Sequence, residues 1–187
     1  MTTTPITIKL TYEDYVYFPE DGKRHELIDG EHFVTPVPLT KHQRISVNLA
    51  AAIHHHCQRT KGGRVFSAPM DVIFTETDVV QPDILYIAKD REHIITRENI
   101  QGAPDLIVEI LSNSTRRRDE RLKRNLYEQH GVKEYWIVDP ELDSVKLFRL
   151  HEGRYDTPQE LTTEQPHATL TTPLLPGFSL ILSDLFA

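Results

Sequence analysis

Two apolar runs separated by a basic segment form the most regular pattern of the chain, in residues 104–140. The first run, residues 106–111, is typical of a strand that is buried on both faces of a sheet. Turn and cap formers follow it, so a helix is expected to begin just after Ser114. Gly131 is a natural end for this helix, and residues 134–138 again have strand composition. The pattern predicts strand, helix, strand.

The predicted helix is expected to carry two stripes of side chains. Leu122 and Leu126 are four residues apart and form an apolar stripe, whereas Lys123 and Tyr127 form a neighbouring polar and aromatic one. The helix is also the most basic stretch of the chain, through Arg116, Arg117, Arg118, Arg121, Lys123 and Arg124.

Hydrophobic patterning elsewhere predicts a hairpin, a long helix and several short strands. The pair Asp29-Gly30 tolerates positive φ and is expected to join strands at 25–28 and 31–35. Thr40 and Gln43 match a capping box, which predicts a helix from there to about Arg59. Other expectations are a helical turn at 12–17, strands at 64–67, 71–75, 79–87 and 145–150, an irregular surface segment at 151–167 and an extended segment at 173–181. This order predicts a mixed α/β (α+β) class around one sheet.

Composition limits the classes of protein that remain. A chain of 187 residues is expected to form one domain, residues 1–187, with a buried core. The net charge of −7 disfavours nonspecific nucleic-acid binding over the whole surface, so any such binding needs a local basic patch. The single cysteine, Cys57, excludes an intramolecular disulfide and makes a cytoplasmic location the default. No apolar run approaches the ~20 residues of a transmembrane helix, and no membrane association is expected.

Two acids interrupt predicted apolar strands. Asp83 precedes Ile84, and Glu109 lies inside the run 106–111. Because a buried, unpaired carboxylate is costly, both need a compensating partner. If the two converge on one sheet, their oxygens suit Mg²⁺ or Mn²⁺, and Lys123 could then balance charge on a phosphate. The alternative is structural, with Asp83 beginning a strand and Glu109 paired to an arginine.

A cluster of histidines, residues 54–56, precedes Cys57 and raises the possibility of a zinc site. Consecutive helical positions point in different directions and cannot all bind one ion, so this possibility is the weaker one. Tyr135 and Trp136 are expected to pack in the core of the sheet.

An ordered set of short motifs resembles the Uma2 family, which belongs to the PD-(D/E)XK, or restriction-endonuclease-like, superfamily. The resemblance covers about residues 12–150. Its motifs are Glu26-Leu-Ile-Asp29-Gly30, His42, Pro82-Asp83, PDLIVEILS at 104–112, Lys123, Tyr127 and GVKEYWIVDP at 131–140. Each motif alone is weak evidence, and the ordered set is specific.

The resemblance implies a restriction-endonuclease-like fold, a mixed central sheet flanked by helices with an N-terminal β-hairpin. It also implies that Asp83 and Glu109 are catalytic residues that bind the metal. The superfamily signature places a lysine two residues after the second acid, where this chain has Leu111. In Uma2-like sequences a lysine on the next helix takes its place, and Lys123 is the matching residue here.

The resemblance further implies an Mg²⁺- or Mn²⁺-dependent endonuclease, with DNA as the expected substrate. The alternative is a non-catalytic descendant that binds nucleic acid or protein. Glu26 and His42 are possible accessory residues near the metal or a substrate phosphate, or else ordinary surface groups. Arg116, Arg117, Arg118 and Arg121 are candidates for nucleic-acid binding, or form a solvated face. A homodimer is expected from fold analogy alone.

Overall fold

The computed structural model describes residues 8–187, and its centre is a seven-stranded mixed sheet. The strand order is β11-β10-β9-β8-β6-β3, and β12 pairs with β10. These strands are β3 (Gly63–Ser67), β6 (Ile84–Ala88), β8 (Leu106–Ile110), β9 (Glu134–Asp139), β10 (Ser144–His151), β11 (Arg154–Tyr155) and β12 (Gln159–Thr162). The neighbours β8 and β9 run parallel, so the chain must cross over between them, and it does so through the basic helix.

A second, five-stranded sheet begins with the predicted hairpin. The strand order is β2-β1-β5-β4-β7, with β1 (Arg24–Ile28), β2 (Glu31–Thr35), β4 (Val72–Thr75), β5 (Asp78–Val80) and β7 (Ile100–Gln101). Asp29 and Gly30 join β1 to β2 with φ of 51° and 73°, the positive values that their sequence predicts.

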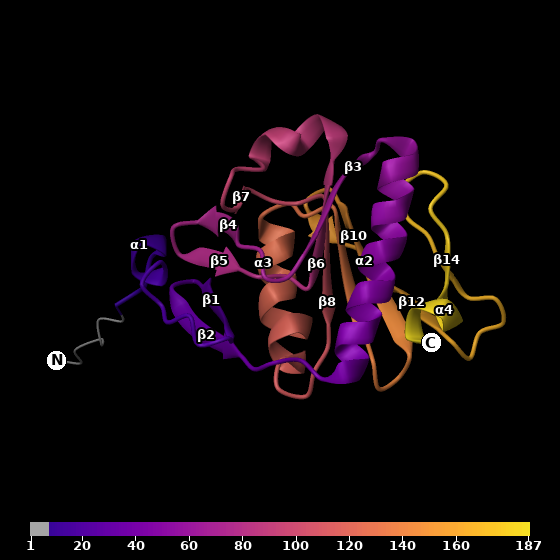
Figure 1. The fold of residues 1–187 in the computed structure, drawn as a ribbon, viewed down its shortest axis with the longest axis horizontal. Coiled ribbons are helices and arrows are strands. Elements are labelled where there is room, and N and C mark those ends of the chain that lie inside the picture. Colours follow the sequence, from indigo (N-terminus) through magenta and orange to yellow (C-terminus); the bar gives the residue numbers. More distant parts are fainter. Residues whose placement is uncertain (1–7) are drawn as a thin grey trace.

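Helical layers cover both faces of the seven-stranded sheet (Figure 1). The long helix α2 (Thr40–Thr60) lies on one face, and α3 (Arg124–Gln129) lies on the other, between the central sheet and the hairpin. A π-helical turn, η2 (Arg118–Lys123), leads into α3. Shorter helices are α1 (Tyr12–Tyr15), η1 (Lys89–Ile94) and α4 (Leu182–Phe186).

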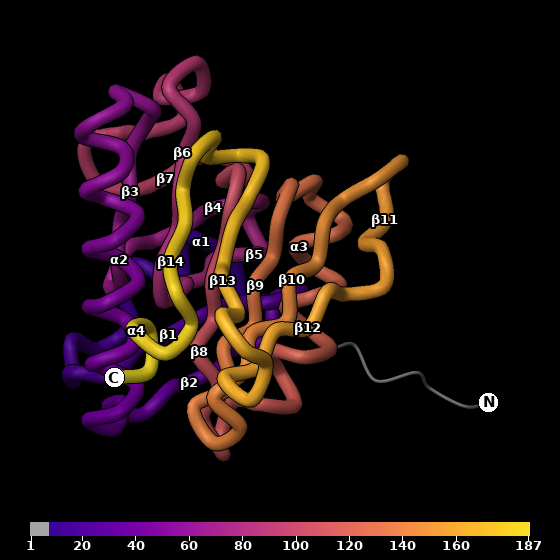
Figure 2. Tube along the Cα trace, turned by 90° about the vertical axis from the view of Figure 1, so that its right-hand side faces the viewer, coloured from indigo at the N-terminus to yellow at the C-terminus, as the bar shows by residue number. Residues whose placement is uncertain are grey.

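The C-terminal part of the chain lies on the same face as α2 (Figure 2). It includes the paired strands β13 (Thr169–Leu170) and β14 (Leu180–Ile181) and ends in α4. Asn48 of α2 donates a hydrogen bond to the carbonyl of Leu185 and so joins α4 to α2.

Strand alternation decides which side chains reach which layer. In β8, Leu106 and Val108 pack on the α2 side, and Ile107 packs on the α3 side. Glu109 therefore points toward α3 and the hairpin. The predicted mixed class, the flanking helices and the N-terminal hairpin are confirmed. The prediction of a single sheet is wrong, because the described strands form a seven-stranded, a five-stranded and a two-stranded sheet.

Several local expectations differ from the structure. The capping box predicted at Thr40 and Gln43 does not form, because the N-cap of α2 is Leu39 and no side chain caps the helix. The predicted strand 79–87 is divided between β5 and β6, because the chain passes from one sheet to the other at Pro82-Asp83. The segment 151–167 contains β11 and β12. Leu122 is 38% exposed, whereas Leu126 of the same predicted stripe is buried together with Lys123 and Tyr127. Among residues 8–187, no helix is long and apolar enough to cross a membrane.

Candidate active site

The two predicted metal ligands lie on neighbouring strands of the central sheet. In the antiparallel pair β6 and β8, Ile84 lies opposite Val108. One further residue in this register places Asp83 opposite Glu109, on the same face of the sheet. The backbone N–H of Ile110 donates a hydrogen bond of 2.7 Å to Oδ2 of Asp83, which joins the acid to the end of β8.

Asp83 is held as a carboxylate by two cationic or polar partners. Nη1 of Arg24 donates to its Oδ1 at 2.7 Å, and Nε2 of His42 lies 3.2 Å from its Oδ2. Burial alone would raise the pKa of Asp83, but His42 and Arg24 outweigh burial and lower that pKa to about 2. Asp83 is therefore ionised at neutral pH.

Glu109 has the opposite electrostatic character. It is buried, and its Oε1 accepts hydrogen bonds from Nζ of Lys123 at 2.9 Å and from the hydroxyl of Tyr127 at 2.7 Å. Burial raises the pKa of Glu109 to about 8, and Lys123 offsets only part of this effect. The two acids of the site thus differ in protonation at neutral pH.

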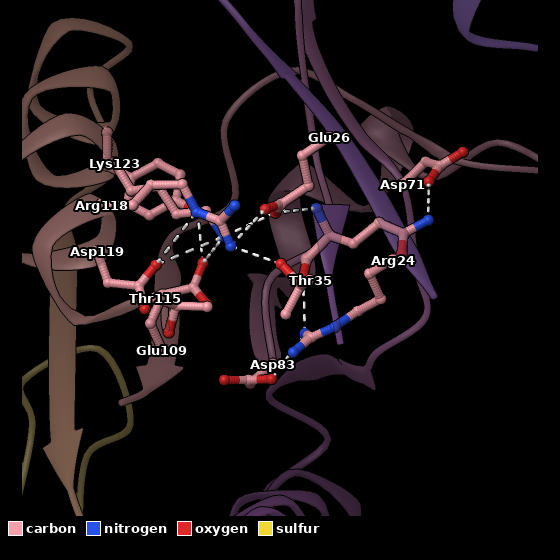
Figure 3. Close-up of polar contacts among 12 residues, drawn as sticks. Arg24, Glu26, Thr35, Asp71, Asp83, Glu109, Thr115, Arg118, Asp119 and Lys123 are labelled. Atoms are coloured by element: carbon pink, nitrogen blue, oxygen red, sulfur yellow. Dashed lines mark hydrogen bonds and ion pairs between the residues drawn. The ribbon is translucent and has the colours of Figure 1, made fainter. Parts of the chain in front are cut away.

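Lys123 lies among carboxylates that come from different parts of the chain (Figure 3). Its Nζ is 2.6 Å from Oε1 of Glu26 in β1, in addition to its contact with Glu109 in β8. Burial disfavours the Lys123 cation, but Glu109 and Glu26 more than compensate and raise its pKa. Burial likewise opposes ionisation of Glu26, and Lys123 together with Arg118 lowers the pKa of that carboxyl below its ordinary value. Lys123 and Glu26 form a buried ion pair.

Asp119 is a further acid of this cluster that was not predicted from the sequence. It is 2% exposed, and its Oδ1 makes no hydrogen bond to any described residue. Its nearest cation is Lys123, with Nζ 3.9 Å from Oδ1. Burial raises the pKa of Asp119 to about 6. In the sequence, the only hint of this role was that Asp119 lies four residues before Lys123. In the structure, both residues belong to the π-helical turn η2, and such turns are often found at functional sites.

These side chains line a small cavity of about 70 Å³. Its lining includes Asp83, Glu109, Asp119, Lys123 and His42. Hard carboxylate oxygens from two strands suit Mg²⁺ or Mn²⁺, and Mg²⁺ commonly takes only one or two protein carboxylates. Hydrogen bonds from the described residues reach Glu109 only through Oε1, so its Oε2 is left for such an ion. Both oxygens of Asp83 already accept hydrogen bonds and would bind an ion through their remaining lone pairs.

The histidine cluster of α2 does not form a ligand set. His56 is buried, and His54 and His55 are exposed on other sides of the helix. Within residues 8–187, no group of three or more His, Cys, Asp or Glu side chains is arranged to hold a metal ion.

Comparison with known proteins decides the family. A profile of the Uma2 family, described as "Putative restriction endonuclease", matches residues 12–183. The chain belongs to the Uma2 family. A similar solved structure is described as "a putative nuclease belonging to DUF820 from Anabaena variabilis ATCC 29413". It is 22% identical, with 95% of this chain and 97% of that chain covered and a TM-score of 0.79, which shows a shared fold. No curated protein matches the sequence.

The four arginines predicted to bind nucleic acid differ from one another in their surroundings in this Uma2 protein. Arg116 makes two contacts with Asp139, at 2.6 and 3.1 Å. Arg118 donates to Oγ1 of Thr35 and lies near Glu26. Arg117 and Arg121 are exposed to solvent. The structure therefore brings Asp83, Glu109, Lys123, Glu26 and His42 together and leaves Arg117 and Arg121 open to a ligand.

Proposed function

We propose that this Uma2 protein is a divalent-metal-dependent endonuclease that hydrolyses phosphodiester bonds, with DNA as its substrate. The observation that carries the proposal is the meeting of Asp83 and Glu109, on adjacent strands, with Lys123 on the following helix. The family description and the shared fold support a nuclease.

Asp83 and Glu109 would hold the ion, which when bound acts as a Lewis acid and lowers the pKa of a water ligand. Arg24 and the backbone of Ile110 orient Asp83, while Tyr127 orients Glu109. The Lys123 cation stabilises negative charge that develops on a phosphate at the site. Its position depends on Glu26, which makes Glu26 a positioning residue.

The first test separates metal binding from folding through Glu109→Gln. The amide keeps the shape of the side chain, and an uncharged group suits this buried position because the pKa of Glu109 is raised to about 8. We expect near wild-type stability, loss of divalent-dependent cleavage, and a fall in Mn²⁺ affinity beyond the ~10–100-fold typical of losing an outer-shell partner. Calorimetry with Mn²⁺ and cleavage assays on single- and double-stranded DNA and RNA measure both effects.

Asp83→Asn is the companion variant and should also abolish cleavage, because it removes the ionised ligand. Its expected cost in stability is larger, since Arg24 then loses its carboxylate partner. Unchanged Mn²⁺ affinity in both variants would show that Asp83 and Glu109 do not bind the metal ion. A protein that binds nucleic acid equally well with and without divalent ions, and never cuts it, would favour the non-catalytic alternative.

The second test concerns the exposed arginines of the basic helix. Each phosphate contact contributes roughly 0.9 to the slope of log binding constant against log salt concentration on duplex DNA. If Arg117 and Arg121 both contact phosphates, replacing both by Ala should make this slope shallower by about 1–2. Arg116→Ala should mainly lower stability, because Arg116 is paired with Asp139. An unaltered salt slope in the double variant would assign Arg117 and Arg121 to a solvated face.

A further inference from the structure

A second and larger cavity opens directly beside the small acidic one. Its volume is about 550 Å³, within the range of roughly 300–1,000 Å³ that is typical of small-molecule sites. The residues that line both cavities are Arg24, Thr35, Pro36, Val37, Pro38, His42 and Asp83. A group in the larger cavity would therefore be adjacent to whatever is bound at the acids.

The walls of this larger cavity combine apolar surfaces with a few polar groups. The segment Pro36–Pro38, which joins β2 to α2, lines one part, and Ala68 and Pro69 line another. Gln43 and Ser46 of α2 supply polar side chains. The charged groups of the lining are Lys23, Arg24, Glu20 and the shared Asp83. Such a lining suits a flat, largely apolar ring that carries hydrogen-bonding edges and is joined to an anion.

His42 marks the junction between the two cavities with an unsatisfied polar atom. The residue is 7% exposed, and its Nε2 is used by Asp83. Its Nδ1 is buried and has no hydrogen-bond partner among residues 8–187. A buried polar atom without a partner is costly, so His42 is a residue of the shared wall whose hydrogen-bonding capacity is not fully used by residues 8–187.

We propose that the larger cavity holds the nucleoside next to the scissile phosphate, with its base out of the helical stack. This inference rests on the proposed nuclease function, since it takes the phosphate to lie at Asp83 and Glu109. A base inside a stacked duplex cannot enter a concave pocket, whereas bases of single strands and unpaired sites can be splayed out and read. The substrate class is single-stranded or locally unpaired nucleic acid.

The experiment measures binding without cleavage, with Ca²⁺ replacing Mg²⁺. The probes are short DNA strands carrying 2-aminopurine, whose fluorescence rises when the base leaves a stack, and the same strands annealed as duplexes. We expect tighter binding of the single strand than of the duplex, because the duplex must first unpair and unstack the base, and increased fluorescence on binding. Equal affinity for both forms without a fluorescence change would overturn the inference.

Matched variants locate the effect in the cavity. Val37→Glu places a charge on the apolar wall that the two cavities share, where Val37 is 73% exposed, and Ser46→Phe fills the larger cavity alone without adding charge. Leu142→Glu is the control, because Leu142 is 65% exposed and does not line either cavity. Both cavity variants should abolish the single-strand preference, and the control should keep it. Persistence of that preference in Ser46→Phe would contradict the assignment.

The experiments distinguish an error in the proposed nuclease activity from an error in the proposed nucleoside site. A protein that never cuts with Mg²⁺ or Mn²⁺, yet shows the preference and the variant effects, lacks the proposed activity but retains the nucleoside site. A protein that cuts duplex and single strands equally, with no 2-aminopurine response, is a nuclease without such a site.

Discussion

Replacing Lys123 by Met is expected to lower the free energy of unfolding by about 3–5 kcal/mol at pH 7, the cost typical of breaking a buried ion pair by removing one partner. The variant keeps most of the volume of the side chain and removes only the cation. Glu26 then remains buried as an anion whose main counter-charge is lost. Urea denaturation, followed by fluorescence of the buried Trp136, measures the change.

The same variant should also lose cleavage activity. A preorganised charge at this position is worth ~2–4 kcal/mol of transition-state stabilisation, which corresponds to a fall of about 30- to 1,000-fold in single-turnover rate. Lys123→Arg should restore little, because a planar guanidinium does not replace a compact ammonium between Glu26 and Glu109.

Two controls separate this loss from a general effect of removing charge. Arg121→Met removes an exposed cation two residues away and should leave stability nearly unchanged. Glu26→Gln combined with Lys123→Met removes both charges of the pair and should be more stable than Lys123→Met alone. A double variant no more stable than the single one would show that Glu26 is not the partner that matters.

Metal affinity is expected to rise about tenfold per pH unit between pH 6 and 8 and then to level off, because binding must displace the proton held by Glu109. The pKa of this group is raised from 4.5 to about 8. Between these values the folded protein keeps a proton that the unfolded chain has lost. The metal-free protein should therefore lose stability from this group as pH rises through that window.

Calorimetry with Mn²⁺ at pH 7, in two buffers with different ionisation enthalpies, should detect release of about one proton per ion bound. Asp83 should contribute none of it, because its pKa is lowered to about 2. Glu109→Gln serves as the control and should release no proton from this site. An affinity independent of pH between 6 and 8 would show that Glu109 is ionised before the metal binds.

Sequence by itself determined the framework that carries the site. The apolar run 106–111, the cap formers after it and Gly131 are local signals, because each depends on the conformational preferences of neighbouring residues. The turn at Asp29-Gly30 is local in the same sense. Acids inside apolar runs were also visible in the sequence, so Asp83 and Glu109 could be named as a pair that needed a partner.

Only the tertiary structure decided which partners those acids have. Lys123 meets Glu26 because β1, from the start of the chain, packs beside the helix that follows β8. Asp119 belongs to the cluster because the π-helical turn buries it, whereas Leu122 of the predicted apolar stripe is exposed. Such contacts depend on the register and packing of distant segments. The pattern of neighbouring residues in the sequence does not specify these contacts. The ion pairs of the site can therefore be assigned only from the folded structure.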